Sequence, residues 1–341
     1  MEKKSKNPLK SILTIVISLA FAGFFLWLAL KGLDFKVIKA SLAKANYLWV
    51  LFASVFGILA YWFRAVRWNL MLEPMGHKIS NSNSLWSISF GYLMNLTIPR
   101  SGEVARATAL YGVEKVPVDK SFGTIILERV VDLICMLGFL GLTLLFKYEA
   151  ILSFYENSDI QVPNNVLFLL LILAMGTVLF FIFRKRLAGV PFLGKVVSFI
   201  DGIFEGLATI FKLKEKGKFI LYTIGIWVCY YFAAYLVCFA LPETSNFTIA
   251  DGFFIIVVGT LGMIVPASGG IGAFNLAMKY GFMALFISMG KSAELGGEMG
   301  LTYSFISLPL QITIMLVMGL ISIPMLAKAR EKAVSEKEFE N

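Results

Sequence analysis

Long apolar runs, separated by short polar or basic stretches, dominate the chain. These runs cover residues 11–30, 47–63, 122–146, 165–183, 219–241 and 301–326. A helix needs about 20 apolar residues to cross the hydrocarbon core of a bilayer, so each run predicts a transmembrane helix. The runs are continuous rather than alternating, which argues against a transmembrane β-barrel.

Three further apolar stretches are shorter: residues 84–99, 253–265 and 273–286. Residues 84–99 are also polar, and the basic residues on both sides predict cytoplasmic flanks, so a single crossing is impossible and we expect a re-entrant element. Residues 253–286 form either a second re-entrant element, entering from the outside, or two true crossings. Broken helices that enter from opposite faces are common in transporters.

We therefore expect an all-α polytopic membrane protein with about six full transmembrane helices plus two re-entrant elements. An eight-helix count applies if residues 253–286 cross twice. Residues 1–341 form one integral membrane domain in this interpretation, without a soluble catalytic domain.

Composition supports the membrane class. Hydrophobic residues make up 58% of the chain and charged residues 16%, whereas soluble domains average roughly 45–50% and 25%. Disorder is excluded, because it requires low hydrophobicity. The cysteines Cys135, Cys229 and Cys238 lie in apolar runs and predict packing groups rather than disulfides. With one histidine, His77, we expect no metal site, and we expect no cofactor.

The net charge of +9 has its strongest cluster at residues 184–218, which predicts a cytoplasmic loop. Cytoplasmic loops and anionic lipid headgroups account for this charge, so nucleic acid is not an expected partner. The first run is longer than a signal-peptide core of about 7–15 residues, so we expect it to remain uncleaved. The topology puts both termini in the cytoplasm. It also puts the amphipathic, lysine-containing residues 31–44 outside, against the positive-inside trend.

Charged residues within the apolar runs are the strongest functional signal. Glu128, Arg129 and Asp132 lie inside one predicted span, where charges normally face a cavity or a partner. Glu128 and Asp132 share a helix face, and Arg129 is i,i+3 from Asp132. The cluster is either a self-neutralising structural group or a site for a charged headgroup or a coupling ion, and both can hold.

A second group of charges follows the first re-entrant stretch. Arg100, Glu103 and Arg106 come directly after Pro99, with Gly102 between them. Guanidinium groups suit phosphate, although a basic cytoplasmic loop is the alternative.

Two arginines, Arg64 and Arg67, precede Trp68 at the end of the second span. This combination predicts interfacial anchors, with a headgroup contact as the alternative.

The last candidate is the loop with Pro266, Gly269, Gly270 and Gly272, followed by Asn275. A helix that begins near Gly272 would offer its first amides to an anion, whereas a tight turn is the alternative. The run matches neither a Rossmann nor a P-loop pattern.

Together these motifs resemble the lysylphosphatidylglycerol synthase transmembrane family, the flippase-like membrane domain of the multiple peptide resistance factor. The matching segments are residues 64–68, 99–106, 128–132 and 266–275. In two-part members this domain moves an aminoacylated phospholipid across the bilayer. Only a short tail follows the last predicted span, so the resemblance implies a stand-alone relative. Members usually carry an acid at the position of Asn275 and a proline at residues 267–268, so this chain is expected to handle a different lipid.

The leading functional hypothesis is a translocase of the bacterial cytoplasmic (inner) membrane that moves a phospholipid or a polyprenyl-phosphate-type lipid. Arg100, Arg106 and Arg129 would bind the phosphate, while Glu128 and Asp132 would balance Arg129 or accept a cation or proton. One alternative is a membrane-embedded enzyme with Glu103 as its carboxylate. Another is an accessory partner of a lipid-synthesis enzyme. Membrane lipids are the expected partners, and without an ATP-binding motif uphill transport would need an ion gradient or lipid consumption.

Overall fold

The computed structural model describes residues 35–98, 100–157, 213–264 and 270–340, with a few isolated positions elsewhere. The predicted spans at residues 11–30 and 165–183 therefore lie outside the continuously described ranges, as do Pro99, Pro266 and Gly269.

Helices account for nearly all of the described residues, and none of those residues forms a strand. In chain order they are α2 (Phe35–Lys44), α3 (Tyr47–Leu72), α4 (Asn81–Thr97), α5 (Gly102–Glu114), α6 (Val118–Asn157), α9 (Lys216–Cys238), α10 (Ile249–Ile264), α11 (Ala273–Ser288) and α12 (Ala293–Glu340). Short 3-10 turns follow α3 and α9, at Glu73–Met75 and Pro242–Thr244.

The prediction of an all-α polytopic membrane protein is confirmed. Within the described ranges, four segments are long and apolar enough to cross a membrane: Tyr47–Met75, Val118–Ser153, Lys216–Cys238 and Ala293–Ala333. Two shorter apolar helices, α10 and α11, match the predicted broken stretches. Whether these two re-enter or cross stays a prediction.

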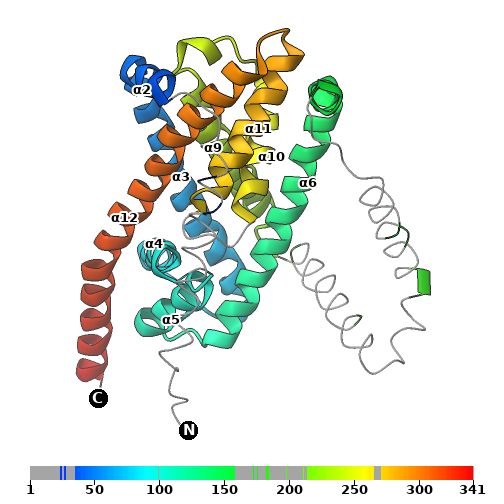
Figure 1. The fold of residues 1–341 in the computed structure, drawn as a ribbon. Helices are drawn as coiled ribbons and strands as arrows, with labels where there is room; N and C mark the ends of the chain where they lie inside the picture. Colours follow the sequence, from blue (N-terminus) through cyan, green and yellow to red (C-terminus); the bar gives the residue numbers. More distant parts are fainter. Residues whose placement is uncertain are drawn as a thin grey trace.

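The long helices set the frame of the molecule. In Figure 1, α6 and α12 run along opposite sides, with α10 and α11 between them in the upper part and α4 and α5 in the lower part. α3 packs along α9, and α12 packs against both α11 and α4. α12 continues through Pro309 and Pro324, where kinks are predicted, whereas α6 departs from helical geometry at Lys147 (φ −130°, ψ 21°).

α4 and α5 form a tight helical hairpin. The Asn95 side chain accepts a hydrogen bond from the Gly102 amide at 2.7 Å, and Arg100 turns the chain with a positive φ of 60°. Gly91 and Gly102 face each other so closely that a Cβ on either would collide with the carbonyl oxygen of the other. This form agrees with the re-entrant interpretation of residues 84–99, whose direction of entry stays a prediction.

α10 and α11 form a second close pair, in which Gly262 lies against Phe274 and Ala277. The chain enters α11 through Gly270 and Gly272, with φ values of 75° and 83°. The Arg100 guanidinium donates to the carbonyl of Ile264, the last residue of α10, at 3.1 Å. The turn of the first predicted re-entrant element therefore contacts the end of α10.

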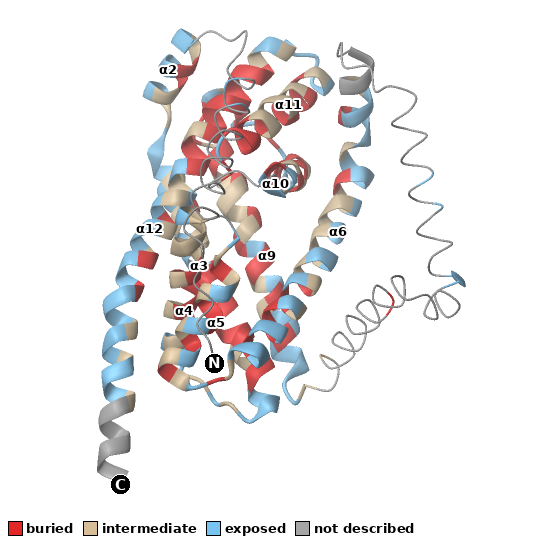
Figure 2. Cartoon of the chain, turned by 60° about the horizontal axis from the view of Figure 1, so that its bottom comes forward, coloured by how far each residue is buried: buried red, intermediate tan, exposed pale blue. Residues whose placement is uncertain are grey.

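Two apolar cores stabilise the described helices. The larger one joins α9, α10, α11 and α12 around Phe254, Phe282 and Tyr303. The smaller one joins α3, α4, α5 and α6 around Trp68 and Leu110. In Figure 2 buried positions concentrate in the centre, whereas much of α6 and the last part of α12 are exposed. The charged residues described next lie beside the smaller core.

Candidate functional site: a buried arginine–carboxylate cluster

Five charged side chains from three helices meet inside the protein. We call them the buried cluster: Arg64 and Arg67 from α3, Arg106 from α5, and Glu128 and Asp132 from α6. The four best-buried residues are only 3% (Arg64), 0% (Arg67), 4% (Arg106) and 0% (Glu128) exposed. Such burial requires that each charge be paired and hydrogen-bonded.

Glu128 lies at the centre of the buried cluster. Its Oε1 accepts from Arg64 Nε at 3.0 Å and from the Arg64 Nη2. Its Oε2 accepts from Arg106 Nη2 at 2.9 Å. Arg67 Nη2 lies 3.5 Å from Oε1, so one carboxylate lies within ion-pair distance of all three arginines.

Asp132 is one helical turn further along α6 and binds two of the same arginines. Its Oδ2 accepts from Arg64 Nη2 and its Oδ1 from Arg67 Nη2, each at 2.9 Å. The Asp132 side chain is 14% exposed, the most accessible of the five. Arg64 thus bridges the two carboxylates.

Neutral side chains orient the three guanidinium groups. Arg64 Nη1 donates to the Tyr230 hydroxyl at 2.6 Å, and Arg67 Nη1 donates to Thr223 Oγ1 at 3.4 Å. Arg106 stacks on Trp68, with its guanidinium carbon 3.7 Å from the ring centroid. Trp68 Nε1 in turn donates to Thr124 Oγ1 at 2.9 Å. Packing and hydrogen bonds therefore hold the arginines in fixed orientations.

The charges of the buried cluster do not cancel. Three guanidinium groups face two carboxylates, so one positive charge is uncompensated among these five residues. Burial lowers the pKa of the Arg106 guanidinium and Glu128 opposes this effect, but arginine starts so high that it stays protonated. Within the described ranges, Nε of Arg67 and Nε of Arg106 are buried without a hydrogen-bond partner. An anion is the chemical group that would complete this arrangement.

A small pocket opens beside Arg106. Tyr92, Asn95, Glu103 and Arg129 are among its lining residues, and Arg129 Nη2 pairs with Glu103 Oε1 at 3.4 Å. This rim pair is solvent-accessible, with side-chain exposures of 45% for Arg129 and 29% for Glu103. The pocket volume of about 10 Å³ holds roughly one water molecule, so this conformation is closed to a headgroup.

The structure changes part of the sequence interpretation. Glu128 and Asp132 share a face, as their spacing predicts, but they bind Arg64, Arg67 and Arg106 rather than Arg129. The expectation that Arg64 and Arg67 act as interfacial anchors is wrong, because both side chains are buried. The physical reason is that the carboxylates of α6 neutralise them inside the protein.

The remaining predicted site residues that the structure describes make their hydrogen bonds outside the buried cluster. Arg100 is exposed and binds Ile264. Asn275 is buried, accepts from the Gly272 amide at 2.9 Å and donates to Ser304 Oγ at 2.7 Å. It thus caps the start of α11, and the positive φ of Gly270 and Gly272 fits the tight-turn alternative.

Sequence reasoning missed the neutral partners and one distant ion pair. Tyr230 and Thr223 lie in an apolar run without any local signal, whereas the i,i+3 spacing of Arg64 and Arg67 could have indicated a shared face. Lys147 Nζ pairs with Asp251 Oδ1 at 2.6 Å, and Asp251 is fully buried. This pair joins α6 to α10, and the predicted topology places both residues at the outer end.

Comparisons with known proteins agree with these features. The chain is 30% identical over 129 residues to a UPF0104 membrane protein of Methanocaldococcus jannaschii. The matched region covers 37% of this chain and 38% of that relative. The match thus spans well under half of the relative. No solved structure matches the chain. A sequence model described as the lysylphosphatidylglycerol synthase TM region matches residues 15–326, and the chain therefore belongs to the lysylphosphatidylglycerol synthase transmembrane family.

Proposed function

We propose that this protein is a lipid translocase that moves a phosphate-bearing lipid, a phospholipid or a polyprenyl-phosphate-type lipid, between the leaflets of a membrane. The observation that carries the proposal is the uncompensated positive charge of the buried cluster. Charges within a membrane domain are costly and mark substrate or ion pathways. A lipid phosphate supplies the missing negative charge while its acyl chains remain in the bilayer.

The rim pair Arg129–Glu103 is the entry point in this mechanism. Arg129 is exposed enough to meet a phosphate first, and Arg106 lines the same pocket. Arg129 then exchanges Glu103 for the phosphate, which Arg106 draws toward the buried cluster. Bidentate binding by guanidinium groups suits this transfer, because their planar fork matches phosphate oxygens.

Movement of α6 relative to the α4–α5 hairpin opens the pocket. α6 carries Glu128, Arg129 and Asp132, while the hairpin carries Glu103 and Arg106, so separation of these elements breaks the pairs that close the site. At the other end of α6, Lys147 holds the helix to α10. In this mechanism, the contacts at the two ends of α6 close the lipid pathway toward opposite sides of the membrane. We place the protein in the bacterial cytoplasmic membrane, with both termini in the cytoplasm.

Purified protein in liposomes tests the proposal. We would follow fluorescent anionic, zwitterionic and polyprenyl-phosphate lipids by their loss of leaflet asymmetry. Arg129→Ala should slow movement of the preferred lipid at least about tenfold, since the lost contact to a charged group is worth more than 1.4 kcal/mol. Arg129→Lys should retain part of the rate.

Lys120→Gln is the matched control, because Lys120 is an exposed cation on the first turn of the same helix. Its rate should equal that of the unmodified protein. Absence of movement for every lipid with folded protein, or an unchanged rate in Arg129→Ala, would contradict the proposal.

A further inference from the structure

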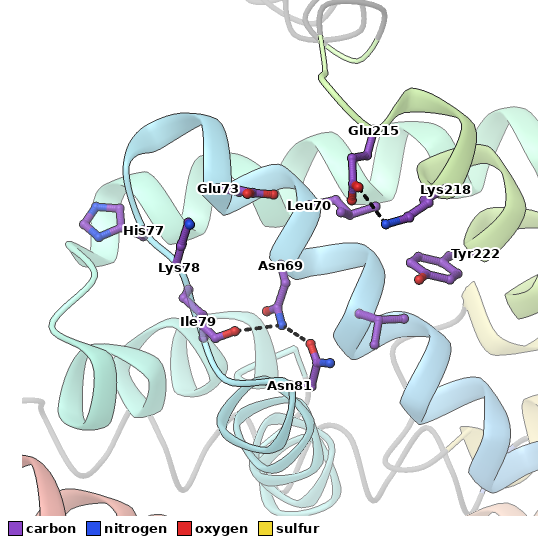
Figure 3. A pocket seen from close by; sticks show the side chains of 11 residues that line it. Asn69, Leu70, Glu73, His77, Lys78, Ile79, Asn81, Glu215, Lys218 and Tyr222 are labelled. Atoms are coloured by element: carbon purple, nitrogen blue, oxygen red, sulfur yellow. Dashed lines mark hydrogen bonds and ion pairs between the residues drawn. The ribbon is translucent and has the colours of Figure 1, made fainter.

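We infer that a second pocket, where α3 ends and α9 begins, binds a small zwitterionic group that combines a primary amine with a phosphate, as in phosphoethanolamine. Figure 3 shows this pocket, with Asn69, Glu73, Lys78 and Lys218 among its lining residues. None of the lining residues belongs to the buried cluster. The inference is therefore independent of the proposed transport.

The pocket is open to the surface and has a suitable size. Its volume is about 260 Å³, just below the roughly 300–1,000 Å³ of most small-molecule sites. It therefore suits a compact polar group rather than a large ligand. One wall is fixed by Asn69, whose Nδ2 donates to the Ile79 carbonyl at 3.2 Å and to Asn81 Oδ1 at 2.6 Å.

The charges around the pocket balance but are not all paired. Lys218 Nζ binds Glu215 Oε1 at 2.6 Å. Glu73 and Lys78 form no ion pair with any residue of the described ranges. Within the described part of the chain, the Glu73 carboxylate and the Lys78 ammonium group thus line one pocket without a direct ion-pair partner, although Glu73 lies close enough to Lys218 to act on its charge. Because the lining contains as many acidic as basic side chains, apart from His77, a zwitterion matches it better than a simple anion.

His77 adds a further polar contact. Its Nε2 is buried, and no group in the described part of the chain hydrogen-bonds to it. The backbone turns sharply just before it, at Gly76, with a positive φ of 86°. A ligand phosphate or amine in the pocket would provide the missing partner.

The position of the pocket suits a membrane lipid as well as a free metabolite. The candidate span of α3 ends at Met75 and that of α9 begins at Lys216, so the pocket lies where two spans reach the same membrane surface. A headgroup can enter it while the acyl chains stay in the bilayer. A lipid headgroup and a free metabolite would both present an amine and a phosphate, and the experiment below distinguishes these two sources.

Binding to the full-length protein in detergent tests the inference. Isothermal titration calorimetry would use glycerophosphoethanolamine, short-chain phosphatidylethanolamine and inorganic phosphate as separate probes. Lys78→Gln should weaken glycerophosphoethanolamine about tenfold, because it removes a charge-assisted contact. Glu73→Gln should weaken it similarly while leaving phosphate binding unchanged. Lys120→Gln, an exposed site outside the pocket, should change nothing.

Glu73 and Lys78 are exposed, so an unchanged melting temperature should show that the variants fold. Tighter binding of the short-chain lipid than of the free headgroup would identify a lipid site, and equal binding would identify a soluble ligand; both support the inference. Absence of binding by both amine–phosphate probes would overturn it. Inorganic phosphate that binds as tightly as glycerophosphoethanolamine, with neither affinity changed by Glu73→Gln, would also overturn it in favour of a plain anion site.

Discussion

Glu128 is the residue on which the buried cluster depends most directly, because Arg64, Arg67 and Arg106 all lie within ion-pair distance of it. A neutral side chain at this position leaves three buried cations with one carboxylate. Removal of one member of a buried ion pair typically costs about 3–5 kcal/mol. For the single residue, the main role of Glu128 is therefore to stabilise the folded protein. The same excess of three guanidinium groups over two carboxylates allows the buried cluster to accept an anion.

We predict that Glu128→Gln lowers the unfolding free energy by roughly 3–5 kcal/mol. Denaturant unfolding of the purified protein in detergent measures the change. Glu103→Gln is the control, because the exposed pair of Glu103 with Arg129 should contribute less than about 1 kcal/mol. Similar losses in both variants would refute the central role of Glu128.

The helical hairpin of α4 and α5 depends on the contact between Gly91 and Gly102. A methyl group at Gly102 would meet backbone and Asn95 atoms of α4, which cannot move without separating the helices. Because Arg106 is one turn away on α5, separation would also displace its guanidinium from Glu128. In the α4–α5 hairpin, the close contact of Gly91 with Gly102 therefore helps to fix the position of the Arg106 guanidinium.

We predict that Gly102→Ala destabilises the protein by about 1–3 kcal/mol through overpacking. Gly112→Ala on the same helix meets no atom within 4 Å and should be neutral or stabilising by up to about 1 kcal/mol, since alanine favours helices. Thermal unfolding of both variants compares them directly. Equal melting temperatures would contradict the proposed close contact.

The hydrophobic pattern predicted the elements better than the partners of the charges. Residues 47–63, 122–146 and 301–326 fall within helices, whereas the run 219–241 extends three residues beyond the end of α9 at Cys238. The glycine-rich turn leads into α11 as expected. Length and polar residue content separated α4 from the four segments that are long and apolar enough to cross a membrane. These features are local, so a single sequence contains them.

The partners of the charges are not local. Arg64 and Arg67 follow an apolar run and precede a tryptophan, a pattern typical of an interface, and only the approach of α6 shows that they are buried. Tyr230 becomes a hydrogen-bond partner of Arg64 only because α9 packs on α3. Glu128 and Asp132 could be placed on one face from their spacing, but spacing along one helix cannot identify a partner on another.

At the scale of the whole molecule, α6 is held at two distant points, by the buried cluster and by the Lys147–Asp251 pair. We predict that Lys147→Gln lowers stability, because a fully buried carboxylate loses its ion-pair partner and keeps only its hydrogen bonds from Thr248. In an Asp251→Asn background the same substitution should have little effect, which gives a coupling energy of roughly 0.5–3 kcal/mol in a double-mutant cycle. Strictly additive losses would show that the two residues do not interact energetically.

The orientation of the molecule in the membrane can be tested by cysteine labelling. α2 and the beginning of α6 lie at opposite ends in Figure 1, and the basic loop predicts that the end with Lys120 faces the cytoplasm. In intact cells, a membrane-impermeant maleimide should label Lys39→Cys but not Lys120→Cys, and permeabilisation should expose the latter. The reverse pattern would invert the topology and place the lysines of α2 inside, as the positive-inside trend favours.

The charge count of the buried cluster has an electrical consequence. Moving one elementary charge across a membrane involves about 2.3 kcal/mol of work per 100 mV. A phosphodiester carries one negative charge, so if the lipid is a phospholipid with a single phosphodiester charge, the occupied site is neutral and the empty site carries one positive charge. The transmembrane voltage would then act on the return of the empty site rather than on the step that carries the lipid.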